Sequence, residues 1–286
     1  MHRTSQALSA SLPAARGVGR YATPAEGGMP RLSRRSAAPV TSGRRAGGAP
    51  RPRPGALGPG AIAKEGVTAL AAAVARTSNG SPVVDPAYLV PSRFIDLAVA
   101  AVVLLFAGPL ILLAAIAIKL TSRGPVFFRQ PRAGKNGRPF AMYKFRTMYS
   151  GAHDDKELFR KFNALPTGPC FKIKNDPRVT TVGRWLRRSS IDELPQLFNV
   201  LLGDMALVGP RPLPLDEVRT DTPEQRLRFS VKPGLTCLWQ VCGRTEIPYA
   251  EWLALDVWYV LNRSLSLDLQ ILFKTFPAVL SGRGAY

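Results

Sequence analysis

The chain has 286 residues and a formal net charge of +20, from 39 Lys and Arg against 19 Asp and Glu. A positive excess of this size is typical of proteins that meet nucleic acid or an anionic lipid surface. Three cysteines without metal-type spacing indicate reduced thiols, and with only two histidines a Ser–His or Cys–His nucleophile pair would depend on His153 alone.

Residues 1–85 are rich in Ala, Gly, Pro, Ser and Arg and lack periodicity over long stretches. They carry 12 Lys and Arg against 3 acidic residues, a net +9 of the total +20. Such a segment cannot bury enough apolar surface to offset the entropy lost on ordering. We expect a disordered basic arm over 1–85, unless the start codon is assigned too far upstream, and a folded domain over 86–286.

Residues 97–118 form a run of 22 uncharged and mostly apolar residues. As a straight helix this run would rise about 33 Å, enough to cross a bilayer core of about 30 Å. Pro109 removes a backbone donor and Gly108 eases a sharp bend, so each arm would reach only about 14–17 Å. Basic residues flank both sides of the run. These residues alone leave two structures open, a kinked span and a re-entrant hairpin.

Two short β-prone segments within 124–148 flank the turn-forming residues 135–138 and predict a β-hairpin. In 143–146 two cations alternate with two aromatic residues. On a strand, Lys144 and Arg146 would share one face and the aromatic rings the other. The simpler interpretation is an edge strand with solvated charges, and the alternative is contact with phosphate.

Arg184, Arg187 and Arg188 recur at the spacing of one helical face. Most such runs are solvated. This run leads directly into two adjacent carboxylates, Asp192 and Glu193, which favours contact with a phosphate.

A structural role competes for these two carboxylates. Residues 190–193 (Ser-Ile-Asp-Glu) fit a capping box, with Ser190 as N-cap and Glu193 at N3. Pro195 weakens this interpretation because at the fifth helical position it would forfeit a hydrogen bond. With Asp192 as the cap, Pro195 would fall within the tolerated first turn. Either cap places the acids at the positive end of a helix.

Residues 250–280 combine many large apolar side chains with Trp and Tyr at the edges. Helices of this kind suit a surface half-sunk in the headgroup layer of a membrane. Packing against a soluble core would give the same pattern, and both structures stay open.

The chain from about residue 91 to its end resembles the monotopic phosphoglycosyl transferases, also called bacterial sugar transferases. The resemblance covers roughly two thirds of the sequence in many ordered blocks, and Arg211 lies in one of them. These blocks are GPVFFRQ (124–130), YKFRTM (143–148), NDPRVT (175–180), SIDELPQ (190–196), GDM (203–205), VGPRP (208–212), KPGLT (232–236), WQV (239–241) and GAY (284–286).

The resemblance implies an α+β monotopic membrane protein. Its expected parts are a re-entrant helix-break-helix hairpin over about 93–120, broken at Gly108 and Pro109, a small catalytic domain containing a β-hairpin, and interfacial amphipathic helices. It also implies transfer of a hexose 1-phosphate from a nucleotide diphosphate sugar, UDP-glucose or UDP-galactose, to undecaprenyl phosphate. This reaction would initiate exopolysaccharide or O-antigen synthesis at the cytoplasmic face of the bacterial inner membrane.

The family pattern makes Asp192 the nucleophile, which the sequence alone does not distinguish from Glu193. A carboxylate that attacks a diphosphate needs cations nearby, and we expect Mg²⁺, held by Asp192 and phosphate oxygens. Glu193 would orient the lipid phosphate or the metal. The phosphates would be held by arginines, because their donors bind phosphate bidentately, and by two residues of the hairpin. The predicted phosphate-binding set is Arg187, Arg188, Arg211, Lys144 and Arg146.

The expected partners are the nucleotide sugar, undecaprenyl phosphate and the lipid bilayer, with a homodimer possible and no nucleic acid, because no nucleic-acid motif is present. The competing hypothesis is a cationic membrane-anchored binding or scaffold protein without chemistry. Mg²⁺-dependent release of nucleoside monophosphate separates the two.

Overall fold

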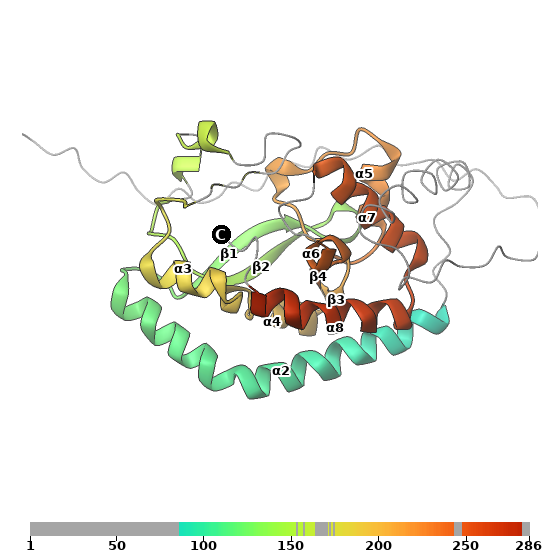
Figure 1. Ribbon diagram of the computed structural model, residues 1–286, viewed down its shortest axis with the longest axis horizontal. Coiled ribbons are helices and arrows are strands. Elements are labelled where there is room, and N and C mark those ends of the chain that lie inside the picture. Colours follow the sequence, from blue (N-terminus) through green and yellow to red (C-terminus); the bar gives the residue numbers. More distant parts are fainter. Residues whose placement is uncertain are drawn as a thin grey trace, which may run out of the picture. The chain divides into compact units, whose positions relative to one another are not determined.

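The structure is a computed structural model that describes residues 86–152, 154–156, 158–163, 171, 173, 175–242 and 248–281. The predicted arm, residues 1–85, lies outside them, so the boundary at residue 86 stays a prediction. The predicted mixture of helices and strands is confirmed (Figure 1). In chain order the helices and strands are α2 (Pro86–Thr121), β1 (Phe127–Ala133), β2 (Pro139–Phe145), α3 (Thr181–Arg188), α4 (Gln196–Leu202), β3 (Ala206–Val208), α5 (Pro223–Leu227), β4 (Gly234–Thr236), α6 (Leu238–Cys242), α7 (Tyr249–Asn262) and α8 (Leu265–Ser281).

The strands form two separate pairs. β1 and β2 are antiparallel, with Phe127 opposite Phe145, and they make the predicted hairpin. Asn136 and Gly137 have φ of 57° and 73° at the turn, the left-handed pair of a type I′ turn. β3 and β4 are parallel, with Val208 opposite Thr236, which brings two distant segments of the chain together.

Helix α2 is one continuous helix of 36 residues that includes Pro109. Figure 1 shows that it is bent, with two arms meeting at an open angle. Pro109 has no N–H for the carbonyl of Leu105 and its ring crowds that turn, which explains a bend. The structure therefore corrects the predicted break at Gly108 and Pro109, because the helix continues through both residues. By length and composition alone, α2 is able to cross a membrane.

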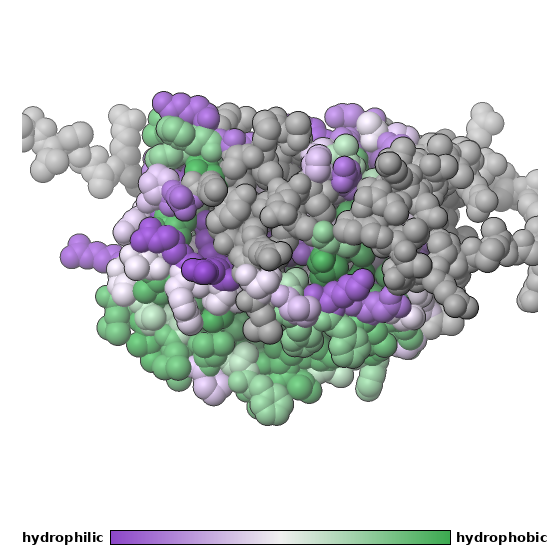
Figure 2. Space-filling view, viewed as in Figure 1, coloured by the Kyte–Doolittle hydropathy of each residue, from purple (hydrophilic) through white to green (hydrophobic). Residues whose placement is uncertain are grey.

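One face of the described residues is strongly apolar. Figure 2 shows this face along the lower edge, where α2 lies in Figure 1. Phe106 on α2 is 78% exposed and Phe273 on α8 is 72% exposed. Soluble proteins rarely present so many large apolar side chains together, so this face indicates a membrane or protein partner. The exposed large side chains on these two helices are Leu89, Val90, Phe94, Leu97, Val102, Leu105, Phe106, Leu110, Leu112, Leu113, Ile116, Leu120, Leu269, Phe273 and Phe276.

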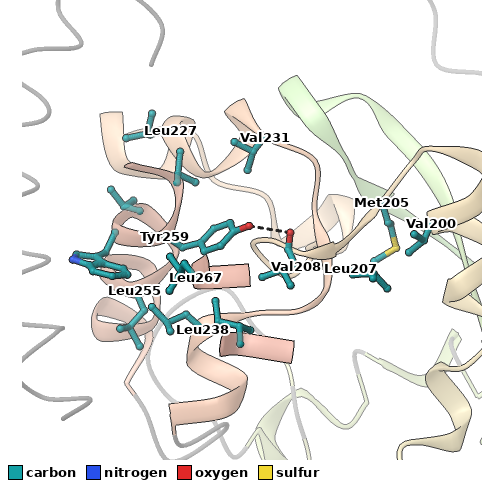
Figure 3. Close-up of a cluster of buried hydrophobic side chains, with 14 of the residues drawn as sticks. Val200, Met205, Leu207, Val208, Leu227, Val231, Leu238, Leu255, Tyr259 and Leu267 are labelled. Carbon is teal, nitrogen blue, oxygen red and sulfur yellow. Dashed lines mark hydrogen bonds between the residues drawn. The ribbon is translucent and has the colours of Figure 1, made fainter. Parts of the chain in front are cut away.

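The main hydrophobic core lies between α4, β3, α7 and α8 (Figure 3). The hydroxyl of Tyr259 on α7 donates to the main-chain oxygen of Val208 at 3.2 Å, so the core also fixes the end of β3. Residues 254–260 of α7 are buried, whereas Phe273 and Phe276 of α8 are exposed. Each of the two structures left open for residues 250–280 therefore applies to one helix. α7 is a core helix, and α8 has one buried and one exposed apolar side.

Polar contacts dock the N-terminal arm of α2 onto this core. Arg93 donates to the carbonyls of Val200 and Leu201 at 2.7 and 3.1 Å, at the C-terminal end of α4. The carboxylate of Asp96 accepts from the N–H of Leu207 at 2.9 Å. A cation at a helix C-terminus and a carboxylate on a strand N–H satisfy groups that would otherwise lack partners. The membrane-competent helix is therefore fixed to the elements that carry the site.

Candidate active site

The two predicted catalytic carboxylates lie in η4 (Ile191–Glu193), a short 3₁₀ turn between α3 and α4. Ser190 before it adopts a left-handed conformation, with φ of 58°, and its side chain makes no capping hydrogen bond. The N-cap of α4 is Pro195. Both capping interpretations are therefore wrong, because Ser190 does not cap with its side chain and α4 begins only after the carboxylates. Asp192 and Glu193 are free for another role.

Glu193 is bound by two cations. Its Oε1 accepts from Nζ of Lys144 at 2.8 Å and from Nη2 of Arg211, while its Oε2 accepts from Nη1 of Arg211 at 3.3 Å. Burial acts to raise the pKa of Glu193, but Arg211 and Lys144 outweigh burial and hold that pKa well below its usual range. Burial also lowers the pKa of Lys144. Glu193 is therefore ionised and held in one place.

Asp192 has a different environment although it is the next residue. It is only 7% exposed, and its carboxylate accepts no hydrogen bond from any residue that the structure describes. Burial first, and then the charge of Glu193, raise its pKa to about 6, against the attraction of Lys144 and Arg187. A buried carboxylate without hydrogen bonds is costly unless a ligand completes its surroundings. Asp192 thus has the properties of a nucleophile or a metal ligand.

The position of Lys144 follows from the two sides of β2. On one side of the strand Phe145 is buried and stacks on Phe127, with ring centroids 5.4 Å apart, which leaves Lys144 on the other side. Asn199 on α4 binds the strand edge, because its Oδ1 accepts from Tyr143 N at 2.9 Å and its Nδ2 donates to Ala141 O at 2.7 Å. The predicted alternation of charge and aromatic residues is confirmed at Lys144 and Phe145. Asn199 was not among the predicted site residues, since nothing local distinguishes it from other helix residues.

Arg211 is presented by a turn where two distant segments touch. The N–H of Gly209 donates to Thr236 O at 3.1 Å, and the N–H of Gly234 donates to Pro210 O at 3.0 Å. A Cβ on Gly234 would lie 2.1 Å from the nitrogen of Gly209, so only glycine fits there. This contact explains why the segments 208–212 and 232–236 carry glycine at these positions.

Arg132 extends the charged cluster and was not among the predicted site residues. Its Nη1 donates to Pro212 O at 2.9 Å, next to Arg211. Burial and the neighbouring charge of Arg211 lower the pKa of Arg132 to about 10, while Glu217 and Glu193 attract it. Only the pairing of β1 with the turn after β3 brings Arg132 here, and the sequence gives no sign of that contact.

The predicted phosphate-binding residues separate into two groups. Arg187 on α3 donates from Nε to Thr147 Oγ1 at 2.9 Å, and the charge of Asp192 reaches it, so it joins Lys144 and Arg211 in the cluster. Arg146 instead binds main-chain oxygens of residues 122 and 123 after α2. Arg188 is exposed on α3. The structure therefore does not bring Arg146 or Arg188 to the carboxylates.

No group of three or more His, Cys, Asp or Glu that could hold a metal occurs within the described part of the chain. Mg²⁺, however, binds through one or two carboxylates plus phosphate oxygens and water. The carboxylate of Asp192 accepts no hydrogen bond from the described residues, so it fits this role, whereas Glu193 already accepts three. The residues present fit a magnesium ion that a substrate would help to hold.

Comparisons with known proteins agree with this site. The family described as "Bacterial sugar transferase" matches residues 87–282. The chain is 43% identical over 197 residues to "Exopolysaccharide production protein ExoY" of Rhizobium meliloti (strain 1021), covering 68% of this chain and 87% of that protein. It is 41% identical over 215 residues to "UDP-glucose:undecaprenyl-phosphate glucose-1-phosphate transferase" of Caulobacter vibrioides, covering 72% of this chain and 76% of that protein.

A longer relative shows the same match. The chain is 42% identical over 198 residues to "Undecaprenyl-phosphate galactose phosphotransferase" of Salmonella typhimurium, covering 68% of this chain but 41% of that protein. The family match over residues 87–282 contains the carboxylates and the cations of the cluster. The chain belongs to the bacterial sugar transferase family.

Proposed function

We propose that this chain transfers a hexose 1-phosphate from a nucleotide diphosphate sugar to undecaprenyl phosphate, through a covalent intermediate on Asp192. The observation that carries the proposal is the contrast between the adjacent acids. Asp192 is buried and accepts no hydrogen bond from the described residues, whereas Glu193 is bound by Lys144 and Arg211. The named reactions of the Salmonella and Caulobacter relatives supply the two substrate classes.

In the first step a carboxylate oxygen of Asp192 attacks the β-phosphorus of the nucleotide sugar. The bond between this phosphorus and the bridging oxygen breaks, and that oxygen leaves on the nucleoside monophosphate. The product is an acyl phosphate that links Asp192 to the hexose 1-phosphate. In the second step an oxygen of undecaprenyl phosphate attacks the same phosphorus, which releases the carboxylate and gives the undecaprenyl diphosphate sugar.

The surrounding cations make this approach of like charges feasible. Arg187, Arg211 and Lys144 would hold the phosphate oxygens as negative charge gathers in the transition state. Glu193 would keep Arg211 and Lys144 aimed at the reacting phosphate. Bound Mg²⁺ would neutralise charge on the diphosphate, held by Asp192 and phosphate oxygens. In this proposal Arg146 and Arg188 have no part, because the structure does not bring them to the carboxylates.

The membrane arrangement follows from the need for a lipid-borne acceptor. The exposed apolar side chains of α2 and α8 would enter one leaflet at the cytoplasmic face of the bacterial inner membrane. The bend in α2 supports a re-entrant helix with both of its ends on one side. Reporters fused at the two ends of the chain should both read cytoplasmic. Readings on opposite sides would instead establish a straight span.

The test of the reaction uses purified membranes with UDP-glucose, UDP-galactose and other labelled nucleotide sugars. We expect release of nucleoside monophosphate and formation of a labelled lipid with at least one UDP-hexose, and loss of both products on chelation of Mg²⁺. Such transfer would place the enzyme at the start of exopolysaccharide or O-antigen synthesis. No product with any sugar would return the scaffold hypothesis. Gel filtration of the detergent-solubilised protein tests whether it forms a homodimer.

A further inference from the structure

A buried ion pair lies directly behind Arg211. Nη2 of Arg228 donates to the main-chain oxygen of Arg211 at 2.9 Å and to Oδ2 of Asp256 at 2.8 Å. Arg228 begins η6 (Arg228–Ser230) and is 3% exposed, while Asp256 lies on α7 and is 1% exposed. The pair therefore connects α7 to the turn that presents Arg211, although neither residue touches the reacting carboxylates.

Stability alone does not account for this pair. Nε and Nη1 of Arg228 are buried and have no hydrogen-bond partner among the described residues. Burial outweighs the attraction of Arg228 and raises the pKa of Asp256 to about 6. The rings of Phe229 and Trp252, 5.3 and 5.6 Å from the guanidinium carbon, offset part of this cost. Apolar residues of similar size often replace such pairs with equal or greater stability.

The contact with Arg211 indicates what the pair does. The oxygen that Arg228 binds belongs to Arg211 itself, so the hydrogen bond fixes the main chain from which the guanidinium extends. Arg132 binds the next carbonyl, that of Pro212, at 2.9 Å. The buried Arg228 and the half-buried Arg132 thus hold consecutive carbonyls of one turn. The side chain of Arg211 then reaches Glu193 with both of its terminal nitrogens.

We infer that Arg228 and Asp256 are positioning residues that set the direction of Arg211 toward the reacting phosphate, Arg228 by binding its carbonyl and Asp256 by fixing Arg228. This inference rests on the proposed function, because it assigns Arg211 to the phosphate. A geometric error of about 1 Å in such a group is enough to lower turnover about 100-fold. Both hydrogen bonds leave from Nη2 of Arg228, and the ammonium of a lysine at position 228 would end one bond short of that nitrogen.

A double-mutant cycle tests the inference on the full-length protein in membranes, with nucleoside monophosphate release as the readout. Arg228→Lys should lower kcat/KM about tenfold in the otherwise wild-type enzyme and by less than about twofold when Arg211→Lys is already present. Arg211→Lys keeps the positive charge beside Glu193, so its turnover stays measurable. Equal effects of Arg228→Lys in both backgrounds would overturn the inference.

The matched control is the other buried Arg–Asp pair, which also holds one carbonyl. Arg178 donates to Ala152 O at 3.1 Å and to Asp176 at 2.9 and 2.7 Å, and nothing in the described residues joins it to Arg211. Arg178→Lys should therefore combine additively with Arg211→Lys, within about twofold. If Arg178 coupled to Arg211 as strongly as Arg228 does, the cycle would report only a general loss of fold, and the inference would fail.

A second variant separates positioning from folding. Arg228→Met combined with Asp256→Leu should melt at or near the wild-type temperature and still lose about tenfold or more in kcat/KM. Either unchanged activity or a large loss of melting temperature would overturn the inference, the second because the pair would then be structural. If the wild-type enzyme itself released no nucleoside monophosphate, the proposed function would fail instead, so the two failures are distinguishable.

Discussion

The charged cluster around Asp192 and the apolar face of α2 present opposite problems to the folded chain. In the cluster, a carboxylate is buried without a hydrogen bond from the described residues. On α2, large side chains such as Leu105 and Phe106 are exposed without cover from those residues. Both arrangements are unfavourable in water, the first through lost hydration and the second through exposed apolar area. Under the proposed function, a charged substrate with its metal would make the first arrangement favourable, and a lipid leaflet the second.

The contrast teaches where to look for function in such a chain. The core side chains of Figure 3 need no such partner, because they pack against one another and Tyr259 donates to Val208 O. Local rules fail at the two places that must meet something outside the chain. Substitutions in the charged cluster and substitutions on the apolar face of α2 should therefore have different effects.

The largest effect is expected at the carboxylate of Asp192. Asp192→Asn should lower turnover on the order of 10³-fold or more, because the nucleophile is lost. The same change should raise the free energy of unfolding by about 1–2 kcal/mol at neutral pH, since it removes a buried charge whose pKa is raised. Product release and thermal or urea unfolding measure the two effects. A variant that is both inactive and less stable would argue that Asp192 supports the fold.

Substitution of Glu193 should lower the stability of the fold, whereas substitution of Asp192 should raise it. Glu193→Gln should lower turnover about 100-fold and the free energy of unfolding by about 2–4 kcal/mol, because it leaves Lys144 and Arg211 without their anion. Urea unfolding of the two single variants side by side is the measurement. If both substitutions shifted stability in the same direction, the environments of Asp192 and Glu193 would not differ as described.

Substitutions on the apolar face of α2 should lower the affinity for membranes and leave the fold unchanged. Leu105→Ser combined with Phe106→Ser should weaken binding to anionic vesicles by roughly 2–3 kcal/mol, since two exposed apolar side chains lose their transfer to lipid. The matched control is Leu158→Ser with Phe162→Ser, two exposed side chains of the same types beside η2 (Asp154–Lys156) and in η3 (Arg160–Phe162). These elements lie on the side opposite α2 in Figure 1.

Vesicle flotation measures both pairs of substitutions. The control should bind as the wild-type chain does. Equal losses for both pairs would mean that the face of α2 does not select the membrane.

The pH dependence gives the smallest expected effect. Asp192 must be ionised to attack, so activity should rise as pH increases through about 6 and should be about tenfold lower one unit below. The folded state binds this proton more tightly than the unfolded state, whose carboxyl has a pKa near 3.8, so stability from this group falls as pH rises from about 4 to about 6. Burial also raises the pKa of Asp256 to about 6, so this group lowers stability further as pH rises over the same range.

Glu193 contributes with the opposite sign. Its pKa lies below the usual 4.5, so its stabilising contribution is present above about pH 4.5 and is lost as pH falls through the folded value. Unfolding followed from pH 4 to 8 should therefore show a steeper decline for the wild-type chain than for Asp192→Asn. A pH–activity profile that is flat between 5 and 7 would contradict the ionisation of Asp192 as the controlling event.

The sequence predicted the parts of the site that follow local pattern. Turn residues and alternating charge located the hairpin and Lys144, and the spacing of the arginines located Arg187. Adjacent acids next to an arginine run identified Asp192 and Glu193. The resemblance to a family then chose Asp192 over Glu193 as the nucleophile. The main charged groups of the cluster therefore follow from short-range pattern together with that resemblance.

The remaining features depend on contacts that no local pattern contains. The left-handed conformation of Ser190, whose side chain makes no cap, depends on how α3 meets η4. Arg146 lies in the same alternating pattern as Lys144, yet the carbonyls that follow α2 take up its donors. Asn199 and Arg132 enter the site only through strand edges paired in three dimensions. The bend of α2 was predicted from Pro109, but the continuity of the helix through it was not.

The most direct measurement is the mass of the protein after mixing with a UDP-hexose and Mg²⁺ in the absence of undecaprenyl phosphate. A covalent intermediate predicts an increase equal to one hexose phosphate less one water, on a peptide that contains Asp192, with release of one equivalent of nucleoside monophosphate. The increase should be absent in Asp192→Asn and should disappear from the wild-type protein when undecaprenyl phosphate is added. An unchanged mass in an enzyme that turns over, or equal labelling of Asp192→Asn, would contradict the account.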